Sequence, residues 1–70
     1  MAEKNVVYSK AFQEGRLQGM RSGLLRQMAQ RFGWISMEDR RRLRQIRSER
    51  RLLQLADKIL TARSLREMGL

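Results

Sequence analysis

The chain has 70 residues, no cysteine, histidine or proline, and a formal net charge of +9 at pH 7. A chain of this length forms one domain at most, and it buries only about 60% of its unfolded surface, so its core is small. Without cysteine and histidine, the chain has no disulfide, no zinc site of the usual Cys/His type and no histidine base.

No apolar run is long enough to span a membrane, and the first residues, MAEKNVVYSKAF, lack the apolar segment of a signal peptide. We therefore expect a cytoplasmic protein. Because proline is absent, we expect mostly uninterrupted helix. We expect no cofactor, no metal and no small-molecule ligand.

The first predicted element is a long helix from about Val7 to Phe32, preceded by a frayed lead-in of residues 1–6. Its apolar residues project onto two faces when they are spaced at about 100° per residue. One face is a broad apolar stripe of Leu17, Met20, Leu24, Leu25, Met28 and Phe32. The other face holds Tyr8, Phe12, Gly15, Gly19 and Gly23. A chain this short hardly covers both faces, so we expect self-association, as a dimer or a higher oligomer.

The three glycines of the second face lower the stability of the helix, because each glycine in a helix interior reduces helix propensity by about 1 kcal/mol relative to alanine. We interpret them as a close seam between helices, extended by Tyr8 and Phe12. The seam is either within the chain or between chains, and the second apolar face favours a seam between chains. Arg16 and Arg21 interrupt the row, which excludes a membrane helix pair. The alternative is an exposed helix that tolerates glycine.

A short connection, GWIS, follows the long helix. Gly33 is expected to cap the end of that helix, with Trp34 and Ile35 packed beneath the helices. Ser36, followed by acidic residues, approximates a capping box and opens a second helix over about 37–47.

After the second helix, the apolar residues project onto a different side of the helical wheel. One straight helix could not bury both sets of apolar residues against one partner. A break is expected near Ser48, which caps a third helix over about 49–61. SLRE at 64–67 is a further capping box and opens a short last turn. The predicted fold is therefore one all-α domain over 7–70, with two or three short helices after the long one. The predicted core is Leu24, Met28, Phe32, Trp34, Leu43, Ile46, Leu52, Leu55 and Ile59.

The segment DRRRLRQIRSERR, residues 39–51, holds seven arginines in thirteen residues. Arg40, Arg44 and Arg47 are expected on one helix face, and Arg50 and Arg51 lie in the first turn of the third helix, where an anion is favoured. The candidate binding residues are Arg40, Arg41, Arg44, Arg47, Arg50 and Arg51. Three interpretations stay open: a nucleic-acid backbone bound without sequence specificity, an acidic protein partner, and a solvated basic face without a partner.

Signals of catalysis are nearly absent. Glu38 and Asp39 are consecutive, so on a helix they point apart, and their place at a helix start accounts for them. The glycine row has neither the lysine nor the preceding strand of a phosphate-binding loop. We therefore expect a chain that is not an enzyme.

The order of these signals resembles the C-terminal helical domain of the Rpn family of bacterial recombination-promoting nucleases, also called putative transposases. The resemblance covers about residues 8–68 and is carried by the glycine row, by QRFG at 30–33 and by ADKILTARSL at 56–65. In that family the helical domain follows a PD-(D/E)XK nuclease domain, and this chain has no residues matching its metal-binding motif.

The resemblance implies a non-catalytic oligomerisation or regulatory module. Such a module associates with itself or with a related nuclease that carries the same domain, and a free copy inhibits that nuclease as an antitoxin does. The alternative is a stand-alone basic protein that binds the nucleic-acid backbone without sequence specificity.

Overall fold

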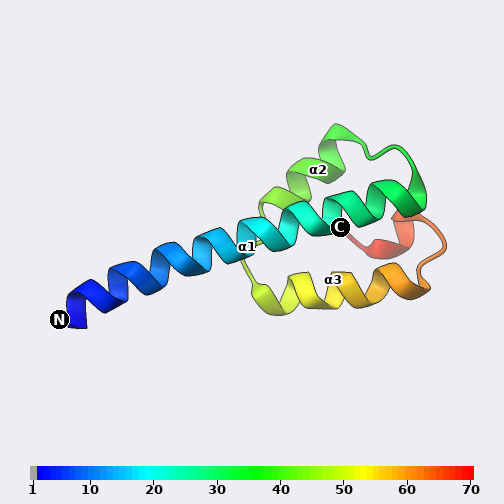
Figure 1. Cartoon of the computed structure of the whole chain (residues 1–70). Coiled ribbons are helices and arrows are strands. Elements are labelled where there is room, and N and C mark those ends of the chain that lie inside the picture. Colours follow the sequence, from blue (N-terminus) through cyan, green and yellow to red (C-terminus); the bar gives the residue numbers. More distant parts are fainter. Residues whose placement is uncertain (1) are drawn as a thin grey trace.

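The computed structural model describes the backbone of residues 2–70 and the side chains from Lys10 onward. Its elements are the helices α1 (Ala2–Phe32), α2 (Met37–Arg44) and α3 (Glu49–Thr61), followed by a short 3-10 turn, η1 (Leu65–Met68). Both α2 and α3 lie along the C-terminal half of α1 (Figure 1). The prediction of an all-α fold with one long helix followed by short ones is thus confirmed.

The N-terminal half of α1 runs beyond the other helices (Figure 1). With 31 residues, α1 is about 46 Å long at 1.5 Å per residue, which accounts for the longest dimension of the chain, 48 Å against 22 and 17 Å. The helix begins at Ala2 rather than at Val7. The side chains of the predicted lead-in, residues 1–6, and of Tyr8 lie outside the described residues.

The core lies where the C-terminal half of α1 meets the other elements. Its buried side chains are Leu24, Met28, Ile35, Leu43, Leu52, Leu55, Ile59, Ala62 and Met68. Phe32 and Ile46 are half-buried and pack against this cluster. Every element therefore contributes to one apolar cluster, and η1 does so through Met68, a residue outside the predicted core.

Trp34 is not part of the core: it is 78% exposed, whereas its neighbour Ile35 is buried. Gly33, with φ of 85°, ends α1, and its N–H donates to the Ala29 carbonyl at 2.9 Å. In an extended chain consecutive side chains point to opposite sides, so only one of the two residues after the glycine faces the core. The prediction that Trp34 and Ile35 both pack beneath the helices is therefore wrong for Trp34.

Two serines begin the short helices, as predicted. The Ser36 hydroxyl accepts the Asp39 N–H at 3.1 Å, and the Ser48 hydroxyl accepts the Arg51 N–H at 3.2 Å. The predicted bounds of the third helix match α3, but α2 ends at Arg44 rather than at residue 47. It ends there because its last turn tightens, as the N–H of residue 45 is shared between two carbonyls of the preceding turn.

The predicted capping box at Ser64 does not form. The Ser64 hydroxyl caps nothing, and the Glu67 carboxylate accepts the N–H of Arg63, one residue before the cap position. The segment forms a single 3-10 turn, closed by Gly69 with φ of 71°. Glycine adopts this left-handed conformation without the steric cost of a side chain.

Three arginine side chains close the C-terminal ends of neighbouring elements. Arg21 Nη1 donates to the Arg44 carbonyl at the end of α2, at 3.3 Å. Arg31 donates through Nε and Nη2 to the Ala62 carbonyl after α3, at 3.1 and 3.0 Å. Arg51 Nη2 donates to the Gly69 carbonyl after η1, at 2.8 Å. Because the last carbonyls of a helix lack internal donors and carry partial negative charge, part of the arginine excess stabilises the fold itself.

We expect Arg31→Ala to lower the free energy of unfolding by about 1–2 kcal/mol, because it removes both donors to the Ala62 carbonyl. Arg26→Ala is the matched control, since Arg26 is exposed on the same helix and makes no side-chain hydrogen bond to a described residue. Urea unfolding measures both variants. An equal loss in the two would contradict the role of Arg31 as a cap of α3.

Candidate association face and arginine groove

The row of Phe12, Gly15, Gly19 and Gly23 on α1 is here called the glycine face. Phe12 is 67% exposed, and Gly15 and Gly19 are exposed as well. A Cβ atom added at any of the three glycines meets no atom of the described residues within 4 Å. No helix among the described residues packs closely on these glycines, so the described part of the chain does not form the seam within itself that the sequence left open.

Two ion pairs mark the point where α1 leaves the helical bundle. Glu14 contacts Arg47 at 3.2 Å, and Arg16 contacts Glu49 at 2.7 Å. Both pairs are largely exposed, so each contributes at most about 1 kcal/mol. They connect α1 to the loop between α2 and α3 through Arg47 and to the first residue of α3, Glu49. The α1 residues before Glu14 lie outside the bundle.

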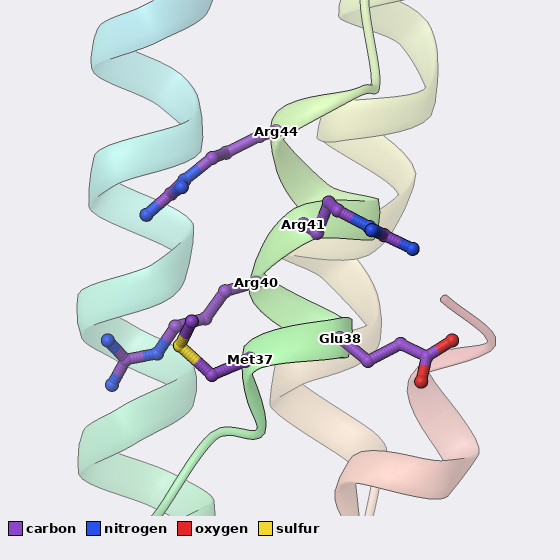
Figure 2. Close-up of a pocket in the computed structure, with 5 residues that line it drawn as sticks. All are labelled: Met37, Glu38, Arg40, Arg41 and Arg44. Atoms are coloured by element: carbon purple, nitrogen blue, oxygen red, sulfur yellow. The ribbon is translucent and has the colours of Figure 1, made fainter.

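Arg47 therefore does not share a helix face with Arg40 and Arg44. It lies in the loop after α2, because that helix ends at Arg44. The prediction of a three-arginine face is corrected to Arg40 and Arg44. Figure 2 shows these two side chains extending from α2 toward α1, while Arg41 points to the opposite side.

The two arginines line a groove between α1 and α2, here called the arginine groove, with a volume of about 330 Å³. Its walls are Gln18, Arg21, Ser22 and Leu25 from α1, and Arg40, Leu43 and Arg44 from α2. Arg21 was not among the predicted binding residues. The sequence signal that could have identified Arg21 is its position four residues before Leu25, because residues four apart lie on the same side of a helix.

Positive charge in the arginine groove has no carboxylate partner among the described residues that line it. The Nε atoms of Arg21 and Arg40 are buried without a hydrogen-bond partner. The acidic residues at the start of α2, Glu38 and Asp39, contact Arg42 instead, at 3.2 and 3.7 Å. The guanidinium groups of Arg21, Arg40 and Arg44 thus share one groove, in which Arg21 also donates through Nη1 to the Arg44 carbonyl.

The remaining candidate arginines do not extend this groove. Both the backbone and the side chain of Arg51 are hydrogen-bonded: its N–H donates to the Ser48 hydroxyl, and its guanidinium donates to the Gly69 carbonyl. Arg50 is exposed in the first turn of α3. The six predicted residues are therefore spread over several sides of the bundle, and only Arg40 and Arg44 lie together in the groove with Arg21.

Among residues 2–70, no helix combines the length and the apolar character needed to cross a bilayer. Among the side chains that the structure describes, from Lys10 onward, no group of three or more acidic residues comes together as a possible metal site. No family model matches the sequence, and neither a curated protein nor a solved structure gives a significant match to the chain.

Proposed function

We propose that this chain is a non-catalytic helical association module that pairs with a second copy through the glycine face of α1. The observation that carries the proposal is the open glycine face on a helix that extends beyond its own bundle (Figure 1). Isolated helical segments shorter than about 12–15 residues are marginal in water. A partner helix supplies the packing that the rest of the chain does not.

The chemistry of the face suits close helix packing. Three glycines let two backbones approach, and their loss of about 3 kcal/mol in helix propensity is offset when the helices gain contacts. Phe12 adds a large apolar side chain at the same face, 67% exposed in the single chain. Burying such a side chain contributes about 1.5–3 kcal/mol.

On its resemblance to the helical domain of Rpn nucleases, we extend the proposal to a partner that carries the same domain. A free copy that occupies one position in the assembly of such a nuclease displaces a catalytic subunit and lowers activity. Adding this chain in excess to a full-length Rpn nuclease is expected to inhibit DNA cleavage. Unchanged cleavage at saturating excess would contradict the regulatory part of the proposal and leave self-association to its own test.

Gly19→Leu is expected to convert the associated protein to monomer, because a leucine at the middle of the glycine face holds the two backbones apart. Sedimentation equilibrium measures the mass, and far-ultraviolet circular dichroism is expected to stay helical. Gly19→Ala distinguishes a close seam from an exposed helix, because it stabilises an exposed helix but not a close seam. It gains about 1 kcal/mol of helix propensity, which a close seam cancels through an overpacking cost of about 1–3 kcal/mol.

Gln13→Leu is the matched control, since it adds the same apolar side chain at an exposed position of α1 that lies about 120° around the helix from Gly19. The control is expected to keep the mass of the parent protein. If Gly19→Leu also keeps that mass and raises the melting temperature, the glycines belong to an exposed helix and the association face is wrong.

A further inference from the structure

Two large apolar side chains are exposed where the chain enters α2: Trp34 in the preceding loop and Met37 at the first position of the helix. Met37 lies beside Arg40 at the base of α2 (Figure 2). Both line a hollow that continues to Arg44 and that also includes Glu38 and Arg41. The carboxylate of Glu38 contacts Arg42. In a chain with so small a core, leaving its single tryptophan 78% exposed gives up a large amount of burial. The informative feature is therefore an exposed aromatic side chain in the segment that leads directly into α2, the helix that carries Arg40 and Arg44.

The arginine row is regular. Arg40 and Arg44 lie one helical turn apart on α2, which separates their Cα atoms by about 6 Å along the helix axis. This separation is close to the distance between neighbouring phosphates of a nucleic-acid strand. Arg21 faces the same groove from α1, and none of the described lining residues is acidic.

We infer that the arginine groove and Trp34 together bind a single-stranded nucleic acid. Successive backbone phosphates contact Arg40 and Arg44, Arg21 approaches the strand from α1, and one base stacks on Trp34. Guanidinium groups bind phosphate oxygens through paired N–H donors, so these contacts carry no base preference. Stacking on an aromatic ring tolerates any base, and base planes are open to it only in a single strand.

A nucleic acid accounts for the two features together. Carboxylates on an acidic protein surface satisfy the arginines but provide no flat ring for Trp34. A duplex satisfies the arginines as well, but its bases are already stacked on one another. The inference thus goes beyond self-association, because it uses the side of α1 that faces α2 and leaves the glycine face open.

Trp34 reports on its own site, because it is the only tryptophan of the chain. Its fluorescence is titrated with a thymidine oligonucleotide, with a duplex of equal phosphate number and with inorganic phosphate. The single strand is expected to quench the fluorescence in a saturable way, the duplex to bind more weakly, and phosphate alone to leave the signal unchanged. Absent quenching, or tighter binding of the duplex, would overturn the inference.

Charge-matched double variants separate the groove from the general charge of the chain. With a dye-labelled oligonucleotide, Arg40→Gln/Arg44→Gln is expected to weaken binding about tenfold for each arginine. The slope of log K against log salt should become shallower by about 0.7 for each lost contact to a single strand. The control, Arg63→Gln/Arg66→Gln, removes the same charge from two exposed arginines of the C-terminal segment, and melting curves check that both proteins fold.

Trp34→Leu completes the test, since it keeps an apolar side chain but removes the aromatic ring. Loss of one stacked base is expected to weaken single-strand binding by about tenfold, within the range measured for base stacking. Equal losses in the two double variants would assign binding to net charge alone. If Trp34→Leu binds the single strand with undiminished affinity, no base stacks on Trp34. Either result would overturn the assigned site.

Discussion

Replacing Leu52 with alanine is expected to lower the free energy of unfolding by about 2–5 kcal/mol. Leu52 is fully buried in α3, within the cluster that joins α1, α2, α3 and η1. The truncation loses the transfer free energy of the removed atoms and leaves a cavity that a small bundle fills only in part. A domain of this size has about 4–10 kcal/mol of stability in total, so the loss is a large share of it.

Leu60→Ala is the control for this experiment. It changes the same residue type in the same helix, but Leu60 is 76% exposed. The cost there is expected to stay within about 0.5 kcal/mol. Thermal unfolding followed by circular dichroism should place the Leu52 variant lower by at least about 10 °C, given the shift per kcal/mol in domains of this size. Similar shifts in both variants would contradict the orientation of α3 in the bundle.

The start of a helix can be predicted from the local sequence where a single residue determines it. Ser36 and Ser48 begin their helices because a serine hydroxyl accepts an N–H of the first turn, and this requires no distant partner. The inner stripe of α1 is equally local, because its period alone places Leu24 and Met28 on one face. These features were predicted from the sequence.

The predictions are wrong where the sequence of a short segment allows the chain to continue in two different directions. The sequence marks Trp34 and Ile35 as apolar, but only the direction of the chain after Gly33 decides which one faces the core. The end of α2 is similar, because no proline or glycine stops that helix and its last turn tightens instead. Arg47 is thereby placed in a loop and pairs with Glu14, a residue 33 positions earlier in the chain.

The candidate binding residues were only partly predictable for the same reason. A run of seven arginines predicts a basic surface but not how the run is divided between elements. The groove depends on Arg21, which lies outside the run and reaches it only when α1 packs on α2. Arginines that cap helix ends, such as Arg31 on Ala62, are likewise visible only after the helices have packed.

Removing residues 1–12 is expected to abolish association while leaving the bundle folded. The deleted segment includes Phe12 and ends before Glu14, the first α1 residue among the described side chains with an ion pair to the bundle. The buried core begins only at Leu24, so the shortened chain keeps every buried apolar side chain among the described residues. Sedimentation equilibrium should give the mass of one chain.

Dilution of the full chain tests the same idea without a change of sequence. If the projecting part of α1 is held by a partner, its helix is lost below the dissociation constant, because an isolated segment of about 12–15 residues is marginal in water. The helical signal per residue should then fall on dilution, and the melting temperature should rise with concentration, as mass action requires of an associating protein.

The shortened chain should show neither dependence on concentration, because its helices are packed within one chain. One result would narrow the association face and another would contradict it. A shortened chain with the mass of the full assembly would show that Phe12 and the projecting part of α1 are not needed, and would leave the contact to the three glycines that this chain keeps. A full chain that is monomeric and equally helical at every concentration would show that α1 extends beyond its bundle without a second copy. In that case the glycines would lie on a helix face that no partner covers.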